Sequence, residues 1–196
     1  MKHCNWLVLG IIFVAGCASA PTPPDQYYRI YAREVAESNA MAPLDGVLIV
    51  RRFLSDGLVG ERSVVYSDSD NDNPLFQYHY HHWTESPTRM LQEQLVPYLR
   101  RAHVAREVVT PDIQVDAEYE ILGKILRLEQ LRGDSPRVVV DIEFSLTKTR
   151  RPELILLRRY SVEVACTDES LVAAVNAFND AVSQIFAELS DDIHAY

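Results

Sequence analysis

The pattern of apolar and polar positions divides the chain into a series of strands and two longer helices. Alternating or β-branched runs predict strands at residues 27–31, 47–53, 63–66, 75–83, 118–129, 137–148 and 154–165. The run at 137–148 alternates most regularly, with Val, Ile, Phe and Leu on one side and acidic or hydroxyl residues on the other. Such one-sided alternation is typical of an antiparallel sheet that is covered on a single face.

Two segments carry apolar residues at three- and four-residue steps, which predicts amphipathic helices. The first opens at Ser86 and Pro87, a favourable cap and first position, and Pro97 is expected to end or kink it. The second begins near Thr167 and Asp168. Its apolar stripe comprises Leu171, Val175, Phe178, Val182, Ile185, Leu189 and Ile193. These elements predict an α+β fold, a mainly antiparallel sheet with two amphipathic helices packed on one face.

The first sixteen residues have the composition of an export signal. Lys2 and His3 precede an uncharged apolar run at 6–15, and small residues then lead directly to Cys17. The run is too short for a transmembrane helix, which needs about twenty apolar residues. Small residues followed by cysteine resemble the lipobox of bacterial lipoproteins, whose cysteine receives diacylglycerol before cleavage. We therefore expect residues 1–16 to be removed and Cys17 to carry lipid; an ordinary secretory signal is the less favoured alternative.

Residues 17–26 form the expected link between this lipid and the folded body. Three prolines within 21–24 favour an extended tether over a helix or a central strand. Ala18 follows the cysteine, whereas enterobacterial lipoproteins that stay in the inner membrane usually have aspartate there. The chain is thus expected to be anchored in the outer membrane, with residues 27–196 forming a single domain in the periplasm.

The chain is acidic, with a formal net charge of −9 over 196 residues. Loss of residues 1–16 removes one lysine and no acidic residue, which leaves −10 on the mature chain. A protein that binds nucleic acid needs a basic face to neutralise phosphates, so the composition argues against that class. Beside Cys17 the mature sequence contains only Cys166, so no intrachain disulfide is expected.

The sequence lacks the common catalytic motifs, including the Gly-x-Ser-x-Gly elbow, the P-loop and the dinucleotide-binding glycine pattern. We therefore expect neither enzymatic activity nor a cofactor. His79 and His81 would share one face of a strand and could hold a metal, but a catalytic zinc site needs three protein ligands. A periplasmic metalloenzyme built on this pair stays open as an alternative. The composition of the polar loop at 68–74 predicts a turn. A calcium-binding loop is less favoured, because that pattern needs a glycine and a late glutamate, and this loop lacks both.

Several short segments match a known family when they are taken in order. They are the lipobox, Tyr27-Tyr28-Arg29-Ile30, Val47-Leu48-Ile49-Val50, Val64-Val65-Tyr66, Tyr78-x-x-x-x-Trp83-x-Glu85-x-Pro87 and an alanine-rich last helix. This order resembles the ABC-type transport auxiliary lipoprotein family, outer-membrane lipoproteins that accompany MCE-type lipid transport systems such as the paraquat-inducible one. The sequence departs from the family pattern at Ser67, where arginine is usual, at Pro97, and in the longer acidic loop at 68–72.

The resemblance implies a non-catalytic protein whose partners are an MCE-domain transport protein and, through its anchor, the outer membrane. It leaves open whether the chain contacts phospholipid and whether it forms a homo-oligomer. We expect the docking surface on the acidic loop and the strand after it, and the candidate residues are Asp68, Asp70, Asp72, Tyr78, Tyr80 and Trp83. Trp83 also has a plainer interpretation, as an aromatic packed where the strand meets the first helix. The rival function is an assembly lipoprotein for an outer-membrane barrel or for the lipopolysaccharide machinery.

Overall fold

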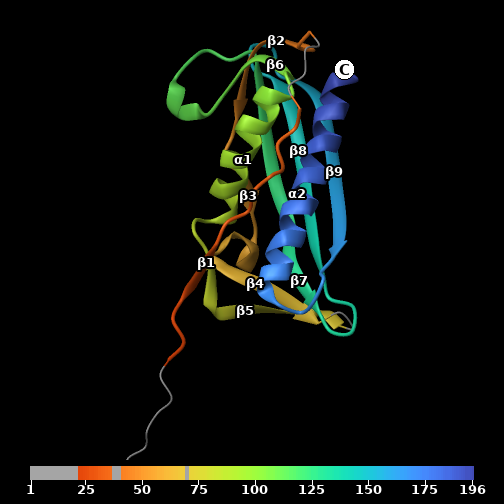
Figure 1. Cartoon of the computed structure of the whole chain (residues 1–196). Coiled ribbons are helices and arrows are strands. Elements are labelled where there is room, and N and C mark those ends of the chain that lie inside the picture. The colour runs from red at the N-terminus through yellow and green to blue at the C-terminus, as the bar shows by residue number, and fades with distance from the viewer. Residues whose placement is uncertain (1–21, 37–40, 69–70) are drawn as a thin grey trace, which may run out of the picture.

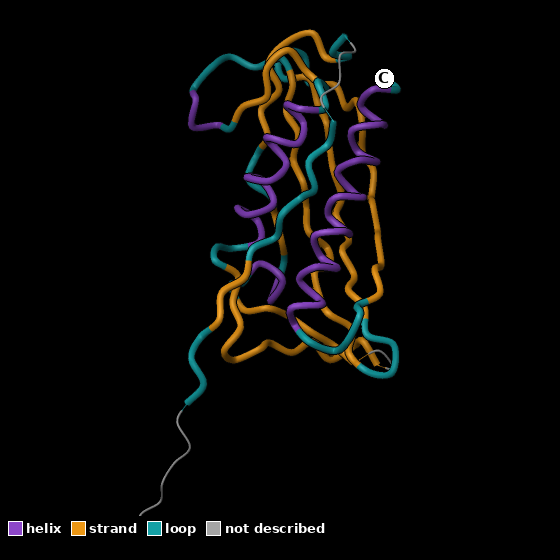
Figure 2. Tube along the Cα trace, viewed as in Figure 1, coloured by secondary structure: helices purple, strands orange, loops and turns teal. Residues whose placement is uncertain are grey.

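Two α-helices lie against the same face of one mixed sheet (Figures 1 and 2). The computed structural model describes residues 22–36, 41–68 and 71–196, so Cys17, the signal segment and Asp70 lie outside the described residues. The helices are α1 (Pro87–Arg101) and α2 (Leu171–His194), and two short 3-10 helices are η1 (Gly57–Gly60) and η2 (Pro111–Ile113). The strands are β1 (Gln26–Tyr28), β2 (Leu44–Val50), β3 (Leu54–Ser55), β4 (Ser63–Asp68), β5 (Asn71–Trp83), β6 (Ala105–Val109), β7 (Tyr119–Arg132), β8 (Arg137–Lys148) and β9 (Glu153–Ala165).

Strand β7 lies at the centre of the sheet and organises both kinds of pairing. It pairs antiparallel with β8, which pairs antiparallel with β9, and these are the two longest ladders. It also pairs parallel with β2, β3 and β4, while β1 runs parallel to β5 and β6 parallel to β2. Among the described residues, five strand pairings are therefore parallel and three antiparallel, counting β4 with β5. The α+β class is confirmed, but the expectation of a mainly antiparallel sheet is wrong. One-sided alternation shows which face of a strand is buried, and it does not show whether neighbouring strands run parallel or antiparallel.

The core lies between the sheet and the two helices, as the apolar stripes predict. On β8 every residue of the predicted inner face is fully buried: Val138, Val140, Ile142, Phe144 and Leu146. The stripe of α2 meets this face, and Phe178, Val182, Ile185 and Leu189 are fully buried as well. The helix begins slightly later than predicted, because Ser170 is its cap and accepts a hydrogen bond from the Ala173 N–H (3.2 Å).

Two element boundaries differ from those expected, for reasons that lie in the packing. Helix α1 continues through Pro97 to Arg101, because buried Val96, Tyr98 and Leu99 beside the proline keep the last turn in place despite a local cost of about 3 kcal/mol. The first strand ends at Tyr28 rather than at residue 31, because the chain then leaves the sheet and enters the space between the two helices.

The body is elongated, and its two ends differ (Figure 1). The described chain enters at one end, beside β1, β4 and β5, which we call the tether end. At the opposite end, which we call the far end, lie the C-terminus, the start of β2 and the projecting loop 110–118 after β6. Within the ranges that the structure describes, no helix has the length and apolarity to cross a membrane.

Candidate functional site

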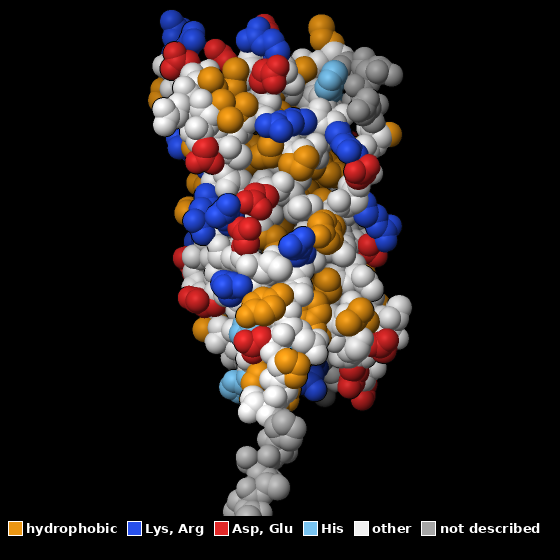
Figure 3. Space-filling model, turned by 60° about the vertical axis from the view of Figure 1, so that its left-hand side comes forward, with side chains coloured by type: hydrophobic (Ala, Val, Ile, Leu, Met, Phe, Trp, Pro, Cys, Tyr) orange, Lys and Arg blue, Asp and Glu red, His pale blue; other side chains and the backbone are white. Residues whose placement is uncertain are grey.

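Aromatic side chains gather at the tether end on two paired strands. Strand β1 lies parallel to the end of β5, so that Tyr27 is level with His82 and Tyr28 with Trp83. Three of these aromatic side chains reach solvent: Tyr27 is 56% exposed, Phe76 42% and Tyr80 37%. The space-filling view shows hydrophobic and histidine side chains at this end of the body, close to where the chain enters (Figure 3).

A connected layer of half-buried rings lies behind one of these exposed residues, Phe76. Tyr66 of β4 stacks on Phe76 (5.4 Å between ring centroids) and contacts Tyr78 (4.5 Å). The Tyr78 ring meets the edge of His81 (5.4 Å), which in turn contacts Tyr28 (5.8 Å). The layer is fixed by polar contacts at its ends, because Tyr78 donates a hydrogen bond to Gln130 and the Tyr28 hydroxyl bonds to His81 Nδ1. Burial raises the pKa of both Tyr28 and Tyr78, so both hydroxyls stay protonated near neutral pH.

The structure places most of the predicted partner residues at this end. Asp68 is exposed at the close of β4, and Tyr80 is exposed on β5. Tyr78 is only half-exposed, because its ring belongs to the supporting layer. Asp72 belongs to strand β5, and Asp70 falls outside the described residues. Asp68 and the aromatic strand β5 therefore lie at the end from which the described chain enters.

Trp83 lies in the core and does not form part of a surface that a partner can reach. It is 1% exposed and packs edge-to-face on Phe178 of α2, with ring centroids 5.6 Å apart. Its backbone N–H donates to the Arg62 carbonyl (2.6 Å), and the Arg62 side chain donates back to the Trp83 carbonyl (3.3 Å). Trp83 was predicted as a candidate residue of the partner surface. The structure corrects this prediction, because the side chain packs between the tether end and α2.

His81 and His82 of β5 contact hydroxyl and carboxylate groups, while His79 is exposed and lies beside the Tyr80 ring (6.4 Å between ring centroids). His81 Nδ1 lies 3.0 Å from the Tyr28 hydroxyl, and His82 Nδ1 lies 3.4 Å from Ser63 Oγ. His82 Nε2 is 3.7 Å from Asp25. Within the described ranges, no group of three or more His, Cys, Asp or Glu side chains is arranged to hold a metal ion.

A second feature, which the sequence did not suggest, is an extended segment in the groove between the helices. We call residues 29–35 the strap. Its backbone is held by side chains instead of a neighbouring strand, and successive N–H groups point to opposite helices, as the twofold period of an extended chain requires. The acceptors are Met90 Sδ for Ile30 (3.4 Å), Asn179 Oδ1 for Tyr31 (2.8 Å), Gln94 Oε1 for Ala32 (3.1 Å) and Ser183 Oγ for Arg33 (2.7 Å).

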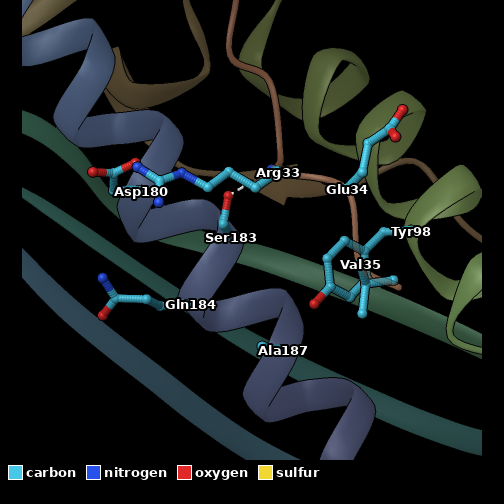
Figure 4. Close-up of a pocket in the computed structure, with 8 residues that line it drawn as sticks. All are labelled: Arg33, Glu34, Val35, Tyr98, Asp180, Ser183, Gln184 and Ala187. Carbon is cyan, nitrogen blue, oxygen red and sulfur yellow. Dashed lines mark hydrogen bonds and ion pairs between the residues drawn. The ribbon is translucent and has the colours of Figure 1, made fainter. Parts of the chain in front are cut away.

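Ion pairs fix the upper part of the strap beside a small open cavity (Figure 4). Arg33 pairs with Asp180 on α2, and Glu34 pairs with Arg101 at the end of α1 (2.5 Å). The hydrogen bond from Arg101 lowers the pKa of Glu34. The cavity measures about 350 Å³ and is bordered by Arg33, Tyr98 and Ser183. Ser183 accepts the Arg33 N–H and the Arg33 side chain is paired with Asp180, so this lining holds the strap in place.

The far end carries a projecting loop that sequence reasoning also missed. Loop 110–118 includes η2 and extends away from the body beside β6 (Figure 1). Ile113 is 56% exposed and Val115 44% exposed, and Gln114 between them has a left-handed backbone (φ 52°). The available signal was a pair of aliphatic residues, Ile113 and Val115, in a segment that contains a proline and two aspartates.

Solved structures of other proteins share this fold. A Xanthomonas campestris protein of the family named DUF330 is 17% identical, with a TM-score of 0.72 over 84% of this chain and 92% of that chain. A second solved structure, of an uncharacterised protein, is 16% identical, with a TM-score of 0.68 over 87% of this chain and 99% of that chain. At these identities the likeness shows a shared fold. Comparison with curated protein sequences gives no significant match.

The family itself is shown by the sequence. The family model described as "ABC-type transport auxiliary lipoprotein component" matches residues 34–191, which include the end of the strap, α1, most of α2 and strands β2 to β9. The earlier resemblance, drawn from short segments, is confirmed by this match over most of the chain. The chain belongs to the ABC-type transport auxiliary lipoprotein family.

Proposed function

We propose that this chain is the outer-membrane lipoprotein of an MCE-type ABC lipid transport system, that it performs no catalysis, and that it docks the periplasmic end of the MCE protein. Family membership supports a role beside an ABC-type transporter. The observation that carries the proposal is the separation of the two ends of the body. The segment that follows the tether enters at β1, whereas loop 110–118 projects at the opposite end.

This separation suits a receptor that stands between a membrane and a periplasmic conduit. A lipid on Cys17 would hold the tether end toward the outer membrane, so the far end would point into the periplasm. A conduit that crosses the periplasm from the inner membrane would meet the far end first. The docking surface in this proposal is therefore loop 110–118.

The loop has the composition of a contact surface. Ile113 and Val115 expose aliphatic side chains on a segment that projects from the body. Exposure of apolar surface to water is unfavourable, so burial of these side chains against a partner would be favourable. Near the base of the loop, Glu118 lies beside Arg150 (3.3 Å), and Arg151 borders the same shallow depression. An apolar tip with charged groups at its rim resembles the anatomy of protein interfaces.

Capture of the MCE protein encoded beside this chain tests the proposal. The bait is the mature chain, residues 17–196, with Cys17→Ser, which retains every described residue. Ile113→Ser combined with Val115→Ser should weaken capture by about tenfold or more, because burial of two aliphatic side chains is worth more than 1.4 kcal/mol. The matched variant at the other end, Asp68→Ser, Asp70→Ser and Asp72→Ser together, should leave capture unchanged.

Each other outcome changes the proposal in a defined way. Loss of capture in the aspartate variant, accompanied by strong weakening at high salt, would move the docking surface to the tether end while keeping the partner. Absence of capture by a correctly folded bait under all salt conditions would remove the MCE partner. That result would favour the alternative of an assembly factor for an outer-membrane barrel or the lipopolysaccharide machinery.

A further inference from the structure

We propose that the strap is a releasable clasp that sets how the body is oriented on its membrane anchor. With the strap seated, the chain leaves the body at the tether end, whereas release of the strap moves this exit to the start of β2 at the far end. Loop 110–118 points away from the membrane in the first state and is free to turn toward it in the second. The inference rests on the proposed function for the lipid at Cys17 and for the docking loop, and it adds a means of regulating that loop.

The strap is held by separate side-chain contacts rather than by a strand ladder. Its four N–H acceptors belong to side chains of the two helices, and one of them, Met90 Sδ, is a weak acceptor. Its ion-pairing side chains, Arg33 and Glu34, are largely exposed, and exposed ion pairs contribute little to stability. Within the strap only Ile30 is fully buried. A segment with so few buried contacts belongs to the part of a fold that opens locally.

Open space lies on both sides of the strap. A cavity of about 350 Å³ on the α2 side is bordered by Ser183 and Gln184 (Figure 4). A second cavity, of about 400 Å³, lies on the α1 side and is bordered by Gln94 and Pro97. Interdigitated side chains would fill such space, as they do in a packed core. The strap therefore lies in the groove without being interlocked with either helix.

The two helices are attached to the sheet independently of the strap. In α1 the Gln92 side chain donates a hydrogen bond to the Val50 carbonyl of β2 (2.8 Å). In α2 the Asp192 carboxylate accepts a hydrogen bond from the Tyr160 hydroxyl of β9 (2.6 Å). Each helix also has fully buried apolar residues of its own, which in α1 include Leu91, Leu95 and Leu99. Release of the strap therefore leaves the sheet and both helices in place.

The consequence of release follows from where β2 begins. Its first residue, Leu44, donates its N–H to the Val104 carbonyl (3.2 Å) at the far end. Gln26, where β1 begins, is nine residues from Cys17, so a fully extended tether spans about 30 Å while the strap is seated. Leu44 is twenty-seven residues from Cys17, which corresponds to about 90 Å. Release thus lengthens the link about threefold and attaches it at the opposite end of the body.

The position of the strap in the chain indicates what would release it. A pull between the lipid anchor and a docked partner acts first on β1 and the strap, because both precede β2 in the chain. Strand β1 is a small obstacle, since it pairs with β5 over only three residues. The clasp would therefore open for a partner that lies beyond the reach of the short tether.

Hydrogen exchange tests whether the strap opens by itself. The sample is the mature chain, residues 17–196, with Cys17→Ser. After correction for intrinsic rates, the amides of residues 30–33 should exchange about tenfold faster or more than those of residues 138–146 in β8, because the strap opens while the sheet stays closed. Equal protection of the two segments would overturn the proposal, because the strap would then open only with the whole fold.

Energy transfer to a membrane tests whether the strap sets the orientation. The mature chain with Cys166→Ala is coupled through Cys17 to a maleimide lipid in phosphatidylcholine vesicles that contain an acceptor-labelled lipid. A donor dye is attached through an azide-bearing residue at position 80, at the tether end, or at position 113, at the far end. Transfer from position 80 should exceed transfer from position 113 while the strap is seated. Equal transfer from the two positions would overturn the proposal.

A loosened variant then tests the strap directly. Ile30→Ser combined with Asn179→Ala and Ser183→Ala removes the buried side chain and two of the N–H acceptors, and it should abolish the difference in transfer. The control, Tyr31→Ser with Gln184→Ala, alters exposed positions on the same strap and helix and should preserve the difference. A difference that survives in the loosened variant would overturn the proposal. Loss of the fold in that variant, followed by circular dichroism, would overturn it too, since release should leave the sheet and helices intact.

These measurements separate the clasp from the proposed function. They use a chemical anchor and contain no MCE protein, whereas capture of the MCE protein uses a bait without an anchor. Either proposal can therefore fail while the other stands.

Discussion

The tether end and the far end both expose apolar side chains, but the two sets differ in chemistry and in support. At the tether end three aromatic residues are exposed, and one of them, Phe76, stacks on a layer of rings and hydrogen-bonded hydroxyls. At the far end loop 110–118 projects from the body and exposes aliphatic residues, and Tyr196 at the C-terminus is exposed as well. A rigid amphipathic surface suits a soft and chemically mixed interface, whereas a projecting aliphatic tip suits insertion into a shaped protein pocket. The two ends therefore offer different chemistry to whatever contacts them.

The comparison depends first on the anchor, and its removal should have the largest effect. Cys17→Ser should leave an unprocessed or free periplasmic protein, because the lipid on this residue is the expected attachment to the membrane. Cell fractionation and mass spectrometry of the N-terminal peptide provide the measurement. Recovery of the variant in the outer membrane without an acyl chain would show that another segment anchors the protein.

Removal of the Trp83 side chain should have the largest effect on stability. The indole is buried against Phe178, so Trp83→Ala should lower the free energy of unfolding by about 3–5 kcal/mol. Tyr80→Ala, on the same strand but with an exposed ring, should change it by only about 0.5 kcal/mol or less. Thermal or urea unfolding measures both. An unchanged stability for the Trp83 variant would mean that the tether end is not built onto the helical core.

The strap that runs between the two ends should contribute an intermediate amount. Asn179→Ala and Ser183→Ala each remove an acceptor for a strap N–H, and each should cost about 0.5–1.5 kcal/mol. Gln184→Ala, an exposed position on the same helix, provides the control. Hydrogen exchange of residues 29–35 should accelerate in the first two variants and stay unchanged in the third. If all three behave alike, these side chains do not hold the strap.

The sequence predicted the elements whose periodicity is set by one continuous buried face. The stripe of α2 and the inner face of β8 were correct because each residue of either set packs into the same core. The strap was missed because the residues around Ile30 fit the pattern of a strand equally well. In the structure Ile30 is buried between the two helices instead. Strand direction was missed for a related reason, since alternation is the same in parallel and antiparallel ladders.

The candidate surface was predicted only in part, because β5 does not keep one register. Its pairing with β4 shifts between Ser63 and Val65, so regular alternation does not extend along the strand. As a result, Tyr80 is exposed, Tyr78 is half-buried and Trp83 is in the core, although all three belong to one aromatic run. No local pattern marks the shift, which follows from the way β5 crosses the end of the sheet.

The smallest predicted effect compares one carboxylate at each end under acid. At the far end Glu118 has a lowered pKa, first because it accepts the Val47 N–H (2.8 Å) and also because Arg150 lies nearby. At the tether end Asp168 has a lowered pKa, because the Ser170 hydroxyl and N–H bind it ahead of α2. A lowered folded-state pKa means that each group stabilises the fold above its ordinary pKa and loses this contribution as pH falls through the folded-state value.

Glu118→Gln should therefore lower the melting temperature slightly at pH 7 and flatten its decline below about pH 4.5, where protonation of this carboxylate in the unfolded chain begins to remove its contribution to stability. Asp168→Asn should act in the same direction at the other end. Since the two carboxylates share no partners, the double variant should show the sum of the single effects. Melting curves from pH 7 to pH 3, followed by circular dichroism, provide the measurement. An effect of the double variant well above that sum would show that the two ends are energetically coupled through the strap and helices, whereas additivity would let each end be altered for its own surface.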